Sequence, residues 1–399
     1  MKVYIVTKEP FPNGMAATNR IKCYARAIIE GGLDCEVLIY GGSEIKGNRI
    51  NNTDAKGDYC GVAFKYIGGT PILPKNKILR RLSQAKRLFL TYIYLLRKLC
   101  TGDILFLFMG GDVRTMLHFM SIAKSKKAFC VRDLCELPYG TGAETEYAIR
   151  MRRITIEEQF PKLNGIISIS DALLNLAKTN TPSSCKHIKV PIMVEYEHYY
   201  INKQPQLDGI PYIFHAGTLY QQKDGILGMI EAFGMAKRRL NRPIKYVLTS
   251  NINASSHPEE LKLLINKYKL EDSLEFVGYL NRDQIKDYLT KAALVISNRP
   301  KTRQDYYGFS TKVGEYLASG TPLLMTNWGE AVKWLKNGES AYIVEPEDTE
   351  ALADAIVHIF SNPEESRRIG LVGQEVCRKC FDYRNWSRPL VDYLNQLGK

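Results

Sequence analysis

The stretch Tyr306-Tyr-Gly-Phe-Ser-Thr-Lys-Val-Gly-Glu-Tyr-Leu-Ala-Ser-Gly-Thr-Pro322 has the pattern of a glycine-bearing loop followed by a short helix. Ser310 or Thr311 can cap this helix, because a hydroxyl accepts a hydrogen bond from a free backbone N–H. Ser319-Gly320 is expected to end the helix, and Pro322 prevents it from continuing. Apolar residues follow the proline, so the stretch predicts a loop–helix–strand unit of an α/β protein.

The same stretch has the features of an anion site. Gly308 allows the backbone to approach a ligand closely, and the start of a helix offers free N–H groups and a positive dipole end. Glu315 is expected about one turn inside the helix, where its carboxylate can face the same ligand. Phosphates at the helix tip and ribose hydroxyls on the carboxylate would suit a sugar nucleotide. Taken alone, the stretch fits any loop–helix–strand unit of an α/β protein equally well. The rest of the chain has to distinguish such a unit from a sugar-nucleotide site.

The length and composition indicate a folded protein of two domains. The chain has 399 residues, which exceeds the usual size of a single hydrophobic core. Its content of 45% hydrophobic residues is typical of a folded globular protein. No apolar run reaches the roughly 18 residues needed to span a bilayer. The apolar run of Met1–Lys8 is too short for a signal peptide and predicts a first strand, so a cytoplasmic protein is expected.

The net charge of +13 admits three classes of partner: nucleic acid, anionic lipid and acidic small molecules. The nine cysteines are scattered, and only Cys377 and Cys380 have the spacing of a metal or redox pair. That spacing also fits one face of a helix, and no second pair exists, so packing is the expected role. The sequence predicts no metal site.

Strand-like and helix-like segments alternate through both halves of the chain, which predicts two doubly wound parallel sheets. In the first half, the expected strands are Val3–Val6, Asp34–Tyr40, Val62–Ile67, Asp103–Phe108, Lys127–Val131 and Gly165–Ile169. In the second half, they are Pro211–Gly217, Ile244–Thr249, Leu274–Val277, Ala293–Ser297, Pro322–Thr326 and Ala341–Glu345. The polar residues 199–210 suit a linker, which gives domains at 1–200 and 210–383.

Residues 75–100 predict a basic amphipathic helix. Lys77, Arg80, Arg81, Arg87 and Lys98 are expected toward one side, beside a wide apolar band with aromatic residues. A helix of this kind commonly lies on an anionic membrane surface. The alternative is a domain helix with a solvated basic face.

Ligands of doubly wound sheets collect at the carboxyl ends of the strands. The loop after the first strand, at Asn13–Thr18, should line such a cleft, but it lacks the G-x-G-x-x-G pattern of a dinucleotide site. Arg132, Asp133 and Glu136 leave a later strand close together, and we expect either a cleft role or a local ion pair. In the second half, Lys223 and the helix at Glu315 follow strands of one sheet and can hold a diphosphate between them.

With these features the chain resembles the retaining glycosyltransferases of family 4, which have the GT-B fold of two facing Rossmann-like domains. The resemblance is clearest at His215–Gly225, Leu274–Leu280 and Gly308–Pro322. It implies that the first domain binds the acceptor and the second binds the nucleotide sugar. It also implies that the C-terminal helix, residues 384–399, packs back onto the first domain, with Trp386 and Tyr393 as packing residues.

The resemblance implies specific site residues. The catalytic residues would be Lys223, Glu315 and Asp133. The donor-binding residues would be Gly217, Thr218, Lys223, Gly278, Arg299, Tyr307, Gly308, Phe309, Ser310, Thr311, Lys312 and Glu315. The acceptor-binding residues would be Asn13, Gly14, Met15, Ala16 and Glu136.

The chain departs from the family pattern in three places. Tyr307 stands where many members have a first glutamate, which leaves Asp305 as the stand-in for the contact to the donor sugar. Thr218-Leu219 stands where many members have an arginine after the glycine, so the positive charge would rest on Lys223 with Lys312 or Arg299. A histidine near the donor sugar is likewise not evident after Val131, where Arg132 follows.

The predicted function is transfer of a sugar from a nucleoside diphosphate sugar to a glycan or lipid-linked acceptor, with retention, in bacterial surface polysaccharide or glycoconjugate synthesis. No cofactor or metal is expected, because cationic side chains and oriented amides can stabilise the leaving diphosphate. The alternatives are a non-catalytic sugar-nucleotide or glycan-binding protein of the same fold and a GT-B epimerase. A nucleic-acid partner is not expected, because it would require a basic groove with interleaved aromatic residues.

Overall fold

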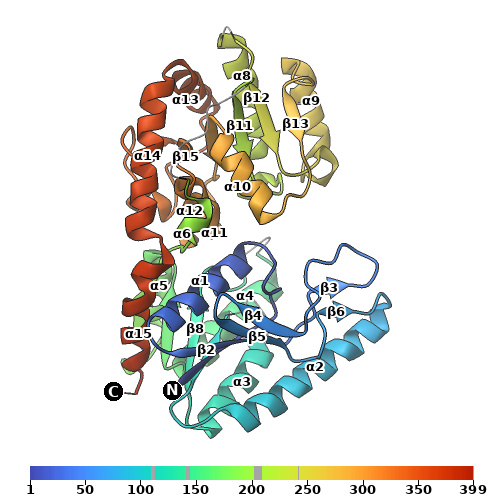
Figure 1. The fold of residues 1–399 in the computed structure, drawn as a ribbon, viewed down its shortest axis with the longest axis vertical. Helices are drawn as coiled ribbons and strands as arrows, with labels where there is room; N and C mark the ends of the chain where they lie inside the picture. The colour runs from blue at the N-terminus through green and yellow to red at the C-terminus, as the bar shows by residue number, and fades with distance from the viewer. Residues whose placement is uncertain (109–112, 141–143, 202–208, 241, 399) are drawn as a thin grey trace. The chain divides into compact units, whose positions relative to one another are not determined.

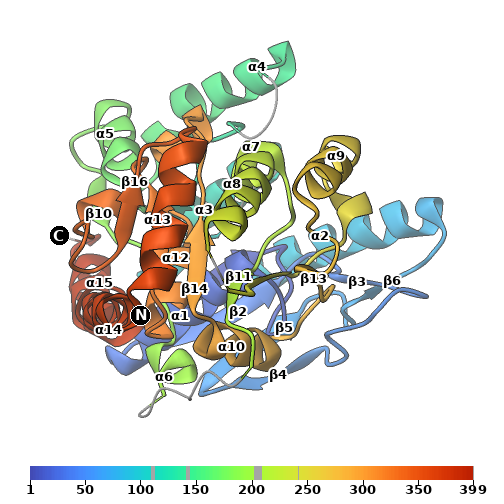
Figure 2. The same ribbon diagram turned by 90° about the horizontal axis from the view of Figure 1, so that it is seen from above.

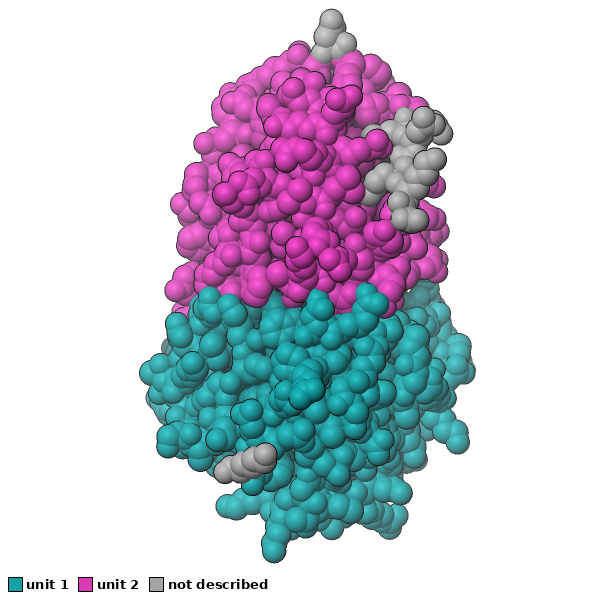
Figure 3. Space-filling view, turned by 60° about the vertical axis from the view of Figure 1, so that its left-hand side comes forward, with its two compact units in different colours: residues 1–193, 383–399 teal, residues 194–382 magenta. Residues whose placement is uncertain are grey.

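The structure is a computed structural model, and it describes residues 1–108, 113–140, 144–201, 209–240 and 242–398 (Figure 1). The chain forms two compact units, shown in different colours in Figure 3. Unit 1 comprises residues 1–193 and 383–399, and unit 2 comprises residues 194–382. The chain therefore passes into unit 2 at Val194, a few residues before the predicted linker, of which residues 202–208 lie outside the described part.

Unit 1 is built on an eight-stranded sheet with the strand order β10-β9-β8-β7-β1-β2-β5-β4. All neighbouring pairs are parallel except β4 with β5 at one edge. The strands are β1 (Lys2–Thr7), β2 (Asp34–Ile39), β4 (Lys56–Tyr59), β5 (Val62–Tyr66), β7 (Ile104–Leu107), β8 (Phe129–Leu134), β9 (Gly165–Ser168) and β10 (Lys186–Lys189). Two short strands, β3 (Glu44–Ile45) and β6 (Ile72–Leu73), pair beside it.

Helices connect these strands. The helices of unit 1 are α1 (Ala16–Glu30), α2 (Lys77–Lys98), α3 (Val113–Ser125), α4 (Glu146–Ile154), α5 (Asp171–Thr179) and α15 (Ser387–Asn395). A π-helical turn (Thr155–Gln159) and two 3-10 turns (Phe160–Lys162 and Tyr383–Trp386) complete the described elements of this unit.

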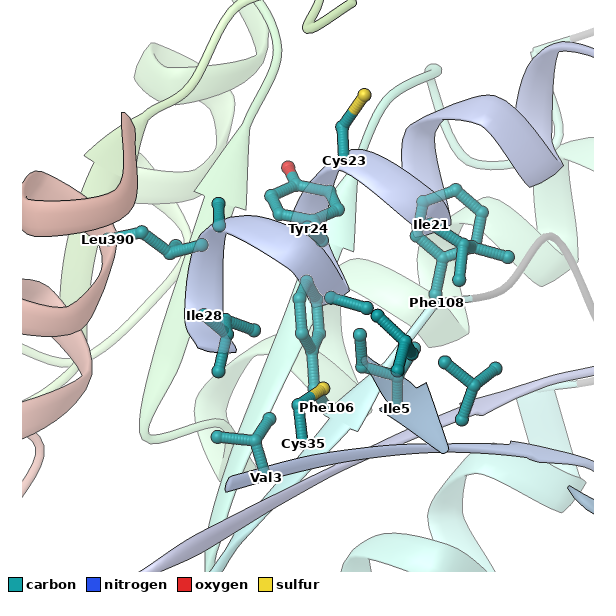
Figure 4. Packing of buried hydrophobic residues seen from close by; sticks show 14 of the residues in the cluster. Val3, Ile5, Ile21, Cys23, Tyr24, Ile28, Cys35, Phe106, Phe108 and Leu390 are labelled. Atoms are coloured by element: carbon teal, nitrogen blue, oxygen red, sulfur yellow. The ribbon is translucent and has the colours of Figure 1, made fainter. Parts of the chain in front are cut away.

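The core of unit 1 lies between α1 and the central strands (Figure 4). β7 is apolar and buried at every position, as expected for a parallel strand covered on both faces. Tyr24 of α1 packs edge-on against Phe106, with ring centroids 5.0 Å apart. Leu390 of α15 belongs to the same cluster, and the Tyr393 hydroxyl donates to the Lys186 carbonyl at 3.1 Å. The C-terminal helix is thus an integral part of unit 1.

Unit 2 contains a six-stranded, fully parallel sheet with the order β13-β12-β11-β14-β15-β16. The strands are β11 (Tyr212–His215), β12 (Lys245–Leu248), β13 (Leu274–Phe276), β14 (Leu294–Ser297), β15 (Leu323–Thr326) and β16 (Tyr342–Val344). The chain fills the sheet outward from β11 on one side and then from β14 on the other. Such a change of direction leaves a crevice at the carboxyl ends of the two strands, where doubly wound proteins bind ligands.

Figure 2 gives a second view of the helices around this sheet. The helices of unit 2 are α6 (Tyr196–Tyr199), α7 (Gln221–Asp224), α8 (Ile226–Arg239), α9 (Pro258–Tyr268), α10 (Arg282–Lys291), α11 (Arg303–Tyr307), α12 (Thr311–Ala318), α13 (Thr349–Ser361) and α14 (Pro363–Cys380). Two 3-10 turns lie at Ile252–Ala254 and Ala331–Lys333.

Every strand expected from the sequence is present, within three residues at either end. The strands that the sequence pattern missed are β3, β4, β6 and β10. β3 and β6 have two residues each, and β4 carries polar residues at an edge of the sheet, so none shows the buried apolar run that marks the central strands. Among the described residues, no helix is long and apolar enough to cross a membrane.

Candidate functional site

A cluster of buried charges lies at the carboxyl ends of β11 and β14. The Lys312 ammonium, on α12, donates to Asp224 Oδ1 at 2.7 Å, and His215 Nε2 lies 3.8 Å from the same oxygen. Arg299 Nη1 lies 4.0 Å from it. The Asp224 carboxylate on α7 is therefore surrounded by His215 of β11, Lys312 of α12 and Arg299 of the loop after β14.

This arrangement fixes the charge states. Burial alone would raise the pKa of Asp224, but Lys312 and His215 hold it well below its usual value. Burial lowers the pKa of Lys312, although the attraction of Asp224 opposes that shift. The Lys312 side chain remains 24% exposed, so its ammonium can still be reached from the crevice.

A second carboxylate holds Arg299 in place. Arg299 Nε donates to Asp305 Oδ1 at 2.8 Å, and the Thr302 hydroxyl donates to Asp305 Oδ2 at 2.6 Å. Asp305 is buried and both of its oxygens accept hydrogen bonds. It therefore positions the Arg299 guanidinium, which fits poorly with the predicted role of contacting the donor sugar.

The backbone at Gly217 lies directly beside these charges. A Cβ at this position would lie 2.6 Å from Lys312 Nζ and 2.3 Å from His215 Nε2, so a larger residue would displace these side chains. Thr218, which follows it, is exposed. The Lys312 ammonium thus comes close to the loop position where the resemblance placed an arginine.

Lys223 and Gly278 lie further from the cluster's centre. Lys223 is exposed on α7, next to the buried Asp224. Gly278 follows β13, two strands away from β11, and has φ +69°, a conformation that favours glycine. The structure therefore brings Gly217, Arg299 and Lys312 together and leaves Lys223 and Gly278 at the surrounding surface.

The loop before α12 differs in detail from the prediction. Ser310 is the N-cap residue, but its side chain makes no capping hydrogen bond, so the predicted cap is wrong. Thr311 begins the helix, and its first turn keeps N–H groups without a side-chain acceptor. Gly308 has φ −88°, which other residues adopt equally well. Phe309 is buried, with its ring 5.6 Å from that of Phe381.

A small hollow opens beside this loop. It is lined by residues of the loop after β14, of α11, of the loop before α12 and of the segment after β15: Arg299, Asp305, Gly308, Ser310, Trp328 and Glu330. Tyr307 ends α11, half-buried, with its ring edge-on to Tyr306 at 5.1 Å. No carboxylate stands at this position, so the departure noted in the sequence persists in the structure.

Glu315 lies one turn into α12, half-buried, with Tyr199 of α6 as a neighbour. Burial raises the pKa of the Tyr199 phenol well above its usual value, and the negative charge of Glu315 adds to the shift. Arg282 bonds to Tyr199 and pairs with buried Glu195 at 2.5 Å. The sequence reasoning missed Tyr199, because it falls in the polar stretch taken as a linker and follows no periodic pattern.

In unit 1, Asp133 is deeply buried and already paired. Arg20 of α1 forms an ion pair with Asp133 Oδ1 at 3.0 Å, and the Tyr24 hydroxyl donates to the same oxygen at 2.6 Å. Arg132 instead donates to Gln159 at 2.7 Å, so the ion pair of Asp133 is with Arg20 and not with its neighbour Arg132. Neighbouring residues of a strand point to opposite faces, which explains their separate partners. The environment of Asp133 fits a structural role better than a catalytic one.

The predicted acceptor residues are accessible. Asn13, Gly14, Met15 and Ala16 are all exposed at the start of α1. The Asn13 side chain donates to the Asn51 carbonyl at 2.9 Å, which ties the loop to the segment between β3 and β4. A Cβ at Gly14 would lie 2.0 Å from the Thr18 hydroxyl, so the loop requires glycine there. Glu136, after β8, is exposed as well.

Comparisons with known proteins agree with this architecture. A 133-residue segment is 27% identical to mannosylfructose-phosphate synthase of Agrobacterium fabrum, covering 33% of this chain and 28% of that protein. Sucrose-phosphate synthase from Thermosynechococcus elongatus has a TM-score of 0.74 at 15% identity, covering 100% of this chain and 99% of that chain. Anabaena HepE in complex with UDP has a TM-score of 0.69 at 12% identity, covering 99% of this chain and 100% of that chain.

The two structural matches extend over the whole chain and establish the fold as GT-B, with two Rossmann-like units. Residues 200–376, which contain the buried charge cluster and α12, match the family described as Glycosyl transferases group 1. Over these residues, which are less than half of the chain, the sequence is therefore similar to the glycosyl transferases group 1 family.

Proposed function

We propose that the protein is a retaining glycosyltransferase of family 4 that transfers a sugar from a nucleoside diphosphate sugar to a hydroxyl of a glycan or lipid-linked acceptor. The observation that carries this proposal is the Lys312 ammonium, held by Asp224 beside the uncapped start of α12. A cation and free N–H groups at the carboxyl edge of a doubly wound sheet suit a diphosphate.

The chemistry needs a stabilised leaving group. The bond between the anomeric carbon and the diphosphate oxygen breaks, and a new bond to the acceptor oxygen forms on the same face of the sugar. Lys312, Arg299 and the first N–H groups of α12 would stabilise the charge on the departing diphosphate. The acceptor's proton would pass to the leaving phosphate. Cationic side chains supply the charge, so we propose that no metal is required.

The remaining site residues have supporting roles in this proposal. Glu315 would accept hydrogen bonds from the ribose hydroxyls, and exposed Lys223 would contact the outer phosphate. The acceptor would bind the loop at Asn13–Ala16, with Glu136 nearby. We place the reaction on the cytoplasmic side, in the synthesis of bacterial surface polysaccharide or glycoconjugate. In support, HepE was solved with UDP and shares the fold.

Titration calorimetry with UDP and GDP tests the donor site directly. We expect the wild type to bind one of them, and Glu315→Ala to weaken the binding by about tenfold or more, because the ribose loses its acceptor for charged hydrogen bonds. Glu271→Ala is the matched control, since Glu271 is exposed in the same unit. Absence of nucleotide binding by the wild type would contradict the proposal.

A further inference from the structure

Helix α2 of unit 1 turns an apolar stripe to solvent. Leu82 and Phe89 are each 62% exposed, and Ile78 and Leu96 are exposed as well. Their spacing of four, seven and seven residues places all four on one face of the helix. A helix at the surface of a globular protein normally turns such a stripe to the core, so this orientation calls for a partner.

The opposite face of α2 already packs on unit 1. Thr91 and Leu95 are fully buried, and the Tyr94 hydroxyl donates to Glu36 at 3.1 Å. Arg87 is also buried and donates to the Ile72 carbonyl at 3.1 Å. The prediction that placed Arg87 on the exposed basic face is therefore wrong. The helix is held by this face, which leaves the apolar stripe exposed to solvent. Figure 1 shows α2 at the outside of unit 1.

Positive charges border the stripe on both sides. On a helical projection, Arg81 lies on one side of it, and Lys86 and Arg97 lie on the other. All three side chains are exposed. The chain contains no aspartate or glutamate between Asp58 and Asp103, so no negative charge within this segment offsets them.

We propose that α2 docks on an anionic lipid surface and lies in its plane, with the stripe in the acyl boundary and the flanking cations on lipid phosphates. An anionic bilayer offers acyl chains to the apolar stripe and phosphates to the flanking cations at the same time. A nucleic acid would neutralise the cations and leave the stripe in water. A second copy of the chain, docked stripe to stripe, would bring two cationic borders together, and like charges repel. The inference is independent of the proposed donor site.

Vesicle co-sedimentation tests this surface. The wild type should sediment with vesicles of equal parts phosphatidylcholine and phosphatidylglycerol, and about tenfold less with phosphatidylcholine alone. Leu82→Glu with Phe89→Glu should lower the partition coefficient for the anionic vesicles by about tenfold or more, because it places charges in the stripe. Reversal of Arg81, Lys86 and Arg97 to glutamate should do the same.

Leu263→Glu is the matched control, because Leu263 is a 68% exposed leucine on α9 of unit 2. It should sediment like the wild type. All the altered side chains are exposed, so the thermal unfolding midpoints should stay close to that of the wild type, which separates lost binding from lost folding. The proposal is overturned if the wild type does not sediment with anionic vesicles, or if the stripe variants sediment as it does. It is also overturned if the wild type is a dimer that Leu82→Glu dissociates.

Discussion

Replacing Lys312 by methionine isolates the charge at the centre of the proposed donor site. Methionine keeps most of the apolar stem but removes the ammonium that lies 2.7 Å from Asp224 Oδ1. Asp224 then stays buried, with His215 Nε2 at 3.8 Å and Arg299 Nη1 at 4.0 Å as its remaining partners. We expect unit 2 to be destabilised, because a buried carboxylate loses its closest counter-charge.

The size of the effect follows from the burial of the pair. Removing one partner of a fully buried ion pair costs about 3–5 kcal/mol. The Lys312 side chain is 24% exposed, so solvent screens part of the attraction. We therefore expect the free energy of unfolding to fall by about 2–3 kcal/mol at neutral pH.

The effect should depend on pH in a defined direction. In the wild type, the depressed pKa of Asp224 stabilises the folded state. This stabilisation is fully present when the pH is above the carboxyl's pKa in the unfolded chain, about 3.9, and it is lost as the pH falls further. In the variant, burial without the ammonium raises the pKa of this carboxyl. A proton then binds the folded variant more tightly than the unfolded chain. The difference in unfolding free energy between the wild type and the variant should therefore become smaller as the pH falls from neutral toward about 4.

Urea unfolding followed by tryptophan fluorescence measures this difference, since Trp328 and Trp334 both lie in unit 2. The two units can unfold separately, so the transition of unit 2 has to be fitted by itself. Lys262→Met, which breaks the exposed pair with Glu259, is the control and should cost less than about 0.5 kcal/mol. A Lys312→Met deficit no larger than the control's, or one independent of pH, would refute the reasoning.

Two further predictions concern the positioning of the site and the core of unit 1. Tyr199→Phe removes the hydroxyl beside Glu315, and we expect nucleotide binding to weaken by about three- to tenfold by calorimetry; unchanged affinity would exclude a positioning role. Arg20→Met strands the buried Asp133 carboxylate, and we expect a loss of about 3–5 kcal/mol in the urea unfolding of unit 1. A loss below about 1 kcal/mol would show that Tyr24 alone holds that carboxylate.

The sequence predicted the architecture well because the central strands are covered on both faces. Strands such as β7 and β14 are apolar at nearly every position, and this pattern is visible without a structure. The missed strands are short or polar, and edge pairing of that kind depends on a neighbour from elsewhere in the chain. The amphipathic character of α2 was likewise visible, but helical spacing could not show which face packs on the fold. Arg87 was therefore placed among the exposed cations, whereas it is buried.

The buried charge cluster of unit 2 was predicted less completely than the fold. Motif spacing pointed to Gly217, Lys312 and Glu315, which the structure places around one crevice. It gave no sign that Asp224 would be the counter-ion of Lys312, because the two residues are separated by 88 positions and only the fold brings them together. Asp305 was taken for a contact to the donor sugar, but its hydrogen bonds to Arg299 and Thr302 could not be inferred from its position in the chain.

The location of the positive charge has a consequence for how the proposed site would work. The resemblance would place an arginine in the loop after β11, where this chain has exposed Thr218. The Lys312 ammonium reaches that loop from α12, close to Gly217, and the same helix presents its uncapped N–H groups. Ammonium and helix dipole are then fixed on one rigid element, so their fields add at the same point without any ordering of the loop. In the proposed reaction, Lys312 on the helix would therefore supply the charge that the resemblance assigns to the loop, and Asp224 would hold the ammonium in place.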